Sequence, residues 1–133
     1  MDALLIIGRI LFAMIFLGSG VAGHILQTDG TAGYAESRGV SNARTLVLIS
    51  GVALVLAAVG IILGIWIDLA ALIAIAFLLA VNVMVHHFWS DDDPMTRQME
   101  MTQFMKNLSM AGAGLIIIAL ADSMGPMLID PLF

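Results

Sequence analysis

The run TLVLISGVALVLAAVGIILGIWIDLAALIAIAFLLAVNVMV, residues 45–85, decides the fold class of this chain. Within it, residues 45–67 and 69–85 contain no ionisable side chain. A helix needs about 20 apolar residues to cross the hydrocarbon core of a bilayer, and lipid admits only helices or closed barrels because it cannot satisfy open backbone groups. The run lacks the strict alternation of a barrel strand, so it predicts two membrane-spanning helices joined by a short link around Trp66.

The composition of the whole chain agrees with a membrane protein. Of its 133 residues, 61% are hydrophobic and 11% are charged, whereas soluble domains carry about 25% charged residues. There is no cysteine, which excludes disulfides, thiolate chemistry and Cys-ligated metals. The formal net charge of −5 argues against a nucleic-acid partner.

The architecture expected is one all-α membrane domain over residues 1–133, an antiparallel bundle of four transmembrane helices with both termini on one side. The spans are predicted at about residues 3–25, 44–64, 68–89 and 103–122. The polar stretch 27–44 predicts turns and a short interfacial helix around Tyr34. Residues 90–101 are expected to be a water-facing loop, and the apolar tail 123–133 to lie on the membrane surface or against a partner.

The basic residues predict the orientation in the membrane. Arg38, Arg44 and Arg97 lie in the connections 27–44 and 90–103, whereas the side of the termini has only Arg9. Basic residues concentrate in cytoplasmic loops. The two connections are therefore expected in the cytoplasm, and the protein in a bacterial or archaeal plasma membrane.

Polar residues gather where the third and fourth predicted spans meet these connections. Asn82 and His86 are four residues apart and share one face of an uninterrupted helix, and Lys106 and Asn107 enter at a similar depth. Amide and imidazole groups can hold a quinone ring while His exchanges protons. The candidate quinone-binding set is Tyr34, Asn82, His86, His87, Trp89, Lys106 and Asn107. The alternative is that His86, His87 and Trp89 form an interfacial belt at a helix end.

A second polar group lies toward the termini. Arg9 falls about two turns inside the first span, where an unpaired charge is costly. Asp68 and Asp122 are its expected partners in a structural ion pair, and the alternative is a contact to an anion or a quinone carbonyl. No metal site is predicted, because neighbouring histidines such as His86 and His87 point about 100° apart on a helix.

The order of these segments resembles the DoxX/DoxD-like family of small four-helix membrane proteins. The matching pieces are GRILFAMIFLGSGVAGH (8–24), YAESRGV (34–40), ILGIWIDLAAL (62–72), HHFW (86–89) and FMKNLSMAGAGL (104–115). The resemblance implies that Arg9, Tyr34, His86 or His87, Trp89, Lys106 and Asn107 are the polar set of the family here. Some relatives are membrane subunits of thiosulfate:quinone oxidoreductase, others accompany oxidative-stress enzymes, and many have no assigned activity.

Three functions remain open at this point, and whether the chain is catalytic is left open with them. The first is a redox-associated subunit that contacts a quinone or a membrane oxidoreductase partner. The second is an accessory subunit that packs in a larger membrane complex or a homo-oligomer. It is favoured by residues 53–55, which are Ala, Leu and Val where many relatives carry a glutamate. The third, a small transporter, lacks the broken helices and charged midplane residues expected of one.

Overall fold

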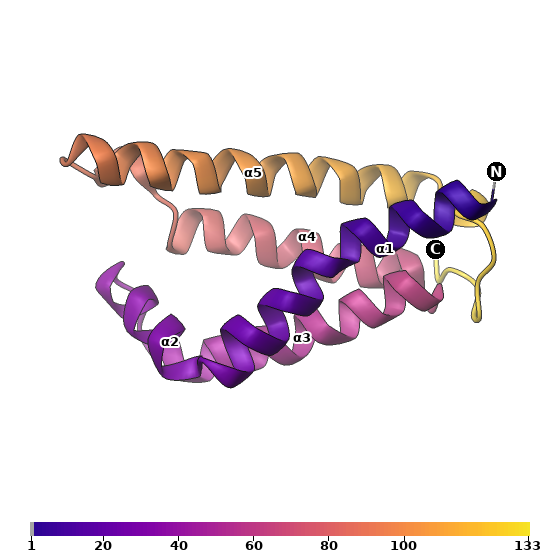
Figure 1. Cartoon of the computed structure of the whole chain (residues 1–133), viewed down its shortest axis with the longest axis horizontal. Coiled ribbons are helices and arrows are strands. Elements are labelled where there is room, and N and C mark those ends of the chain that lie inside the picture. The colour runs from indigo at the N-terminus through magenta and orange to yellow at the C-terminus, as the bar shows by residue number, and fades with distance from the viewer. Residues whose placement is uncertain (1) are drawn as a thin grey trace.

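The computed structural model describes residues 2–133 and confirms the all-helical class (Figure 1). The five α-helices described are α1 (Asp2–Gly18), α2 (Thr28–Ser37), α3 (Ala43–Leu63), α4 (Ile67–Met84) and α5 (Pro94–Ala119). A π-helical segment, η1 (Ser19–Leu26), continues α1, and the short 3₁₀ helices η2 (Phe88–Ser90) and η3 (Ala121–Ser123) follow α4 and α5. Helix α2 is the short helix expected around Tyr34, and its place at the membrane interface stays a prediction.

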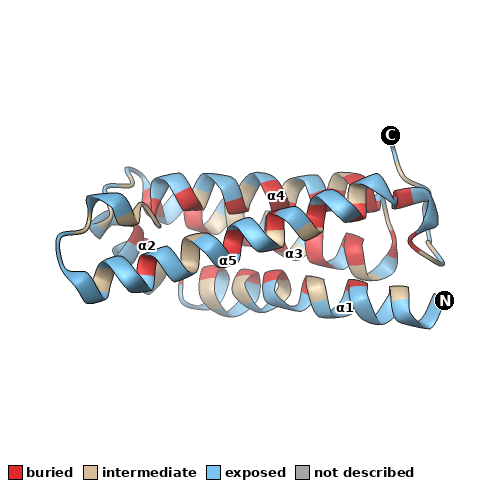
Figure 2. Ribbon diagram, turned by 90° about the horizontal axis from the view of Figure 1, so that it is seen from above, coloured by how far each residue is buried: buried red, intermediate tan, exposed pale blue. Residues whose placement is uncertain are grey.

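Three helical stretches among the described residues are long and apolar enough to cross a membrane: Asp2–Leu26, Ala43–Leu63 and Ile67–Ser90. Their outward faces are apolar as well, with Leu11, Ile49, Leu56 and Val83 all more than half exposed. The surface helices of a soluble bundle would present polar residues there. Buried residues face inward between the helices (Figure 2), so the protein is an integral membrane protein whose outer surface contacts lipid.

The bundle is closed at one end and splayed at the other. The N- and C-termini lie together at the end where α1, α3 and α4 converge (Figure 1). Toward the other end α4 and α5 run on side by side while α2 and α3 diverge from them. The link between α3 and α4 is only residues 64–66, where Gly64 and Trp66 adopt positive φ angles of 66° and 44°. This tight turn forces α3 and α4 to be antiparallel neighbours, as predicted.

Two glycines allow η1 and α3 to cross closely. A Cβ atom at Gly51 would lie 2.6 Å from the Cβ atom of His24, and one at Gly20 would lie 2.9 Å from the carbonyl oxygen of Gly51. Without a hydrophobic driving force between helices in lipid, close packing of small residues stabilises their association. The crossing fixes His24 against α3, which matters for the site described below.

Arg9 closes the end of the bundle where the termini lie. Its side chain is 2% exposed, and the guanidinium donates to four backbone carbonyl oxygens. These are Ile61 O at 2.8 Å, Ile62 O at 2.8 Å, Met124 O at 3.3 Å and Pro126 O at 2.7 Å. The predicted ion pair of Arg9 with Asp68 and Asp122 is therefore wrong. The last carbonyls of α3, which a helix end leaves unpaired, satisfy the charge instead.

Asp68 does not pair with Arg9 but bonds to the C-terminal tail. Its buried Oδ2 accepts from the backbone N–H groups of Leu132 and Phe133, both at 2.6 Å. Leu128 N also donates to Gly64 O at 3.0 Å, whereas Asp122 is exposed. The tail thus folds back on its own chain beside the α3–α4 link. That it lies on the membrane surface or against a partner stays a prediction.

The boundaries of the last two long helices also differ from the prediction. Helix α4 ends at Met84, so His86 does not continue the face of Asn82. Helix α5 begins at Pro94 with Asp93 as its N-cap, accepting from Thr96 N at 2.8 Å. Residues 94–101 are therefore helical rather than a water-facing loop. An Asp followed by a Pro at the first helical position is a regular start signal for a helix.

Replacing Arg9 tests the closure of this end. Arg9→Met leaves four buried carbonyl oxygens without their donor, and we expect it to destabilise the fold by on the order of 3 kcal/mol. Arg9→Lys should recover only part of this, because an ammonium cannot reproduce the planar fork of donors. The measurement is unfolding in mixed micelles by titration with dodecyl sulfate. The control is Arg44→Met, which removes an exposed salt bridge with Asp29. If Arg9→Met destabilises the fold no more than Arg44→Met does, the structural role assigned to Arg9 is contradicted.

Candidate functional site

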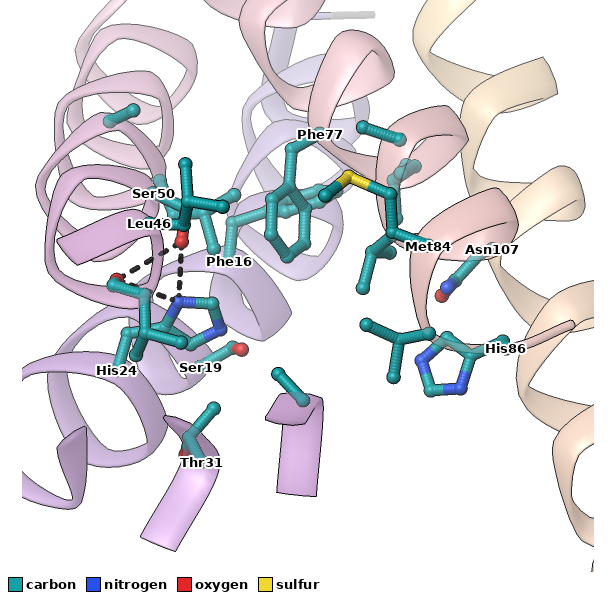
Figure 3. Close-up of a pocket in the computed structure, with 18 of the residues that line it drawn as sticks. Phe16, Ser19, His24, Thr31, Leu46, Ser50, Phe77, Met84, His86 and Asn107 are labelled. Carbon is teal, nitrogen blue, oxygen red and sulfur yellow. Dashed lines mark hydrogen bonds between the residues drawn. The ribbon is translucent and has the colours of Figure 1, made fainter. Parts of the chain in front are cut away.

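A cavity of about 620 Å³ lies between η1, α2 and α3 on one side and α4 and α5 on the other (Figure 3). Most of its lining is apolar and includes Phe16, Leu46, Phe77 and Met84. Polar side chains stand on two opposing walls, with His24 and its neighbours on one and His86 and Asn107 on the other (Figure 3). An apolar cavity with a few placed polar groups is the usual form of a small-molecule site.

His24 forms the first polar wall, and the prediction did not include it in the candidate set. The π-helical turn of η1 directs its ring at α3, where Nδ1 lies 3.2 Å from Val47 O and 2.9 Å from Ser50 Oγ. Phe77 of α4 packs edge-on against the ring, with the centroids 5.5 Å apart. Such π-helical insertions are frequent at functional sites.

Glu100 organises the second polar wall. Its carboxylate is 1% exposed, and it accepts from the hydroxyl of Tyr34 on α2 and lies 2.7 Å from Nδ1 of His86. Three separate segments thus meet at one buried acid. The prediction missed Glu100 because residues 90–101 were assigned to a loop, and the helix start at Asp93–Pro94 was the signal that could have revealed it.

An amide chain supports this wall from within the bundle. Asn82 donates through Nδ2 to Phe104 O at 3.0 Å, and Asn107 donates through Nδ2 to Asn82 Oδ1 at 2.8 Å. Asn107 lines the cavity, whereas Asn82 lies behind it. The expectation that Asn82 and Asn107 lie at matching depth agrees with this contact, and Asn82 acts as the partner that orients Asn107.

The other predicted residues divide into two groups. Lys106 and Tyr34 line the cavity with His86, and Lys106 bonds to Gln103 on the exposed side of α5. His87 and Trp89 do not line it. Trp89 instead packs edge-on against Phe104, with ring centroids 5.9 Å apart. These two residues therefore fit the belt interpretation of the helix end.

Arg38 ties α2 to the segment that follows α4. It forms a two-pronged salt bridge with Asp91 at 2.6 and 3.0 Å and donates through Nε to Val85 O at 2.8 Å. The ring of His87 reaches back to Arg38 O at 3.0 Å. Together with the Tyr34–Glu100 bond, these contacts hold α2 across the splayed end of the bundle, next to the cavity.

The Arg38–Asp91 pair predicts a pH dependence of stability. The hydrogen bond from Arg38 holds the pKa of Asp91 below its usual value. A carboxyl group whose pKa is lowered by folding stabilises the fold above its unfolded pKa of about 3.9, and the contribution is lost as the pH falls through the folded value. We expect Asp91→Asn to lower the melting temperature at pH 7, and the difference from the wild type to shrink below about pH 4.

Asp92→Asn is the matched control for this measurement, because the side chain of Asp92 is exposed one residue away. It should leave the melting curve close to that of the wild type at both pH values. A loss of stability in Asp91→Asn that persists at acid pH, or an equal loss in Asp92→Asn, would contradict the assignment.

The comparisons with known proteins agree with the helical membrane architecture. Residues 4–87 match the family model described as DoxX. The chain is also similar to the inner membrane protein YphA of Escherichia coli, at 33% identity over 114 residues, which is 86% of this chain and 80% of that protein. No solved structure gave a significant match. Because the family model covers well over half of the residues, the chain belongs to the DoxX family of membrane proteins.

Proposed function

We propose that this protein binds a quinone-type head group in the cavity and acts as a redox-associated membrane subunit. The observation on which the proposal rests is the combination of an apolar cavity with polar side chains on its two opposing walls. Phe77 and Met84 offer surfaces for a flat ring, and His24 and His86 offer groups that bond to ring oxygens. The apolar tail of a quinone would leave the cavity between lipid-facing helices.

The buried acid supports a role in proton transfer. Conversion of a quinone to a quinol takes two electrons and two protons. Glu100 contacts both Tyr34 and His86, and hydrogen-bonded groups of this kind can pass a proton between solvent and a bound ring. No group of three or more His, Cys, Asp or Glu residues that could hold a metal was found among residues 2–133. The electrons in this proposal come from a membrane oxidoreductase partner.

The proposal includes four membrane spans, with α5 as the fourth. Helix α5 has 26 residues and is about 39 Å long at 1.5 Å per residue. Its second half exposes Leu108, Leu115 and Ile116, as expected of a lipid-facing surface. In this topology both termini lie outside, and the connections 27–44 and 90–103 with the splayed end of the bundle lie in the cytoplasm.

An accessory role in a larger complex is the second candidate. Its specific support is the first half of α5, which packs on α4 and η2 and exposes Met95, Met99 and Met105. Methionines adapt to varied partner surfaces. In this alternative the cavity would be filled by a lipid chain or by a helix of the partner, and the protein would bring partner subunits rather than a quinone.

The test is mass spectrometry of lipids and proteins that copurify with the chain after gentle extraction from its membrane. Ala53→Phe places a ring in the cavity without altering a polar contact, since Ala53 lines it. Ala119→Phe adds the same ring at an exposed position outside the lining. We expect quinone to copurify with the wild type and with Ala119→Phe, and to fall about tenfold with Ala53→Phe because the ring occupies the binding volume.

The two candidate functions give different outcomes. Stoichiometric partner proteins without quinone would favour the accessory role and contradict the binding site. Quinone retained equally by all three proteins would also contradict it, because the molecule would then be bound elsewhere or carried over with bulk lipid.

A further inference from the structure

Hydrogen-bond acceptors are available on both polar walls of the cavity. His24 shows this most directly. The hydroxyl of Ser50 donates to Val47 O at 3.0 Å, and Val47 O also faces His24 Nδ1 at 3.2 Å. A backbone carbonyl only accepts, so with the Ser50 hydroxyl directed at Val47 O we assign the hydrogen of the neutral ring to Nδ1 of His24, which then donates to Val47 O and Ser50 Oγ. In the neutral ring, Nε2 is then an acceptor, and it has no hydrogen-bond partner among residues 2–133.

Asn107 presents a second acceptor from the opposite wall. Asn82 must direct its Nδ2 at Phe104 O, which only accepts, and so its Oδ1 faces Asn107. Asn107 donates to this oxygen through its own Nδ2. The carbonyl oxygen Oδ1 of Asn107 and the second N–H of its Nδ2 are therefore left for a ligand. Backbone carbonyl groups thus orient the polar side chains of both walls.

His86 extends the same pattern. Tyr34 donates to one oxygen of Glu100, and the second oxygen lies 2.7 Å from Nδ1 of His86. When Glu100 is ionised, this second oxygen accepts from Nδ1–H of His86. Nε2 of His86 is again an acceptor. The donors along the lining are the second N–H of Asn107 and the hydroxyl of Ser19, which can turn either way. Lys106 and Gln103 add N–H donors at the exposed side of α5, where Nζ of Lys106 donates to Oε1 of Gln103. Thr31 commits its proton to Gly23 O.

We infer that the cavity selects a ligand with hydroxyl donors on a ring, so that it binds the reduced quinol rather than the oxidised quinone. A quinol can donate to His24 Nε2 and to Asn107 Oδ1. A quinone only accepts, so it can bond to the second N–H of Asn107 but would face His24 Nε2 without a hydrogen between them. This inference rests on the proposed function and refines it, since it names the redox state that the site holds. Reduced quinol is then the ligand of the resting protein.

The experiment compares three ligands that share one ring and one decyl chain. These are the benzoquinone, its quinol and the dimethyl ether of the quinol, which keeps the shape but loses both donors. Binding to the full chain in phosphatidylcholine nanodiscs is measured by calorimetry, with empty nanodiscs as the blank. The chain has no cysteine, so a thiol reductant can keep the quinol reduced without altering the protein.

We expect the quinol to bind about tenfold more tightly than the quinone or the ether, as a buried hydrogen bond contributes about one decade of affinity. His24→Phe keeps the ring and removes the acceptor, and it should reduce this preference severalfold. Arg44→Gln, outside the cavity lining, should leave the preference unchanged. The comparison of ligands on the wild type stands even if the His24 variant does not fold.

The outcomes separate this inference from the proposed function. Equal or tighter binding of the quinone would overturn the inference and leave the proposed site standing. Binding of none of the three ligands would overturn both. Equally tight binding of diacylglycerol, a lipid with a single hydroxyl, would show that the cavity recognises a lipid hydroxyl rather than a quinol, and would overturn the inference as well.

Discussion

A guanidinium at membrane depth must find its acceptors inside the protein, and the way Arg9 does so shapes the bundle. Its four bonds join α1 to the last carbonyls of α3 and to the segment after η3. The helices are consequently drawn together at the end where the termini lie. Because that end is held together, α2 and α3 diverge from α4 and α5 at the opposite end, where the cavity lies (Figure 1).

The opposite end depends on a second buried charge. Glu100 joins α2, the segment after α4, and α5, and Arg38 adds a salt bridge between α2 and Asp91. A small apolar cluster of Ala32, Ala35, Ala43, Val47 and Val85 packs beneath these contacts. The splayed end is thus bridged by polar contacts rather than closed by close packing. Closely packed helices leave no space for a ligand between them. Helices that are joined only by polar side-chain contacts leave such a space.

The two ends also show what each polar residue does. At the closed end the guanidinium of Arg9 donates to four backbone carbonyl oxygens, and Oδ2 of Asp68 accepts from the backbone of the tail, so Arg9 and the tail are structural. At the splayed end several bonded side chains keep one free atom toward the cavity, as His24 and Asn107 do. A side chain that is oriented by one bond and open at its other atom is prepared to recognise a ligand.

Hydropathy and local signals alone determined the membrane class, the three apolar spans over α1, α3 and α4, the short α3–α4 turn, the presence of a helix around Tyr34 and the family. These properties follow from transfer free energies and turn preferences, which depend on residues close in sequence. Only the tertiary structure decided that Arg9 binds carbonyl oxygens instead of Asp68, and that Tyr34, His86 and Glu100 meet. Those contacts join residues up to 117 positions apart. They depend on helix crossings such as Gly20 against Gly51, whose geometry arises from packing between segments rather than from any one segment.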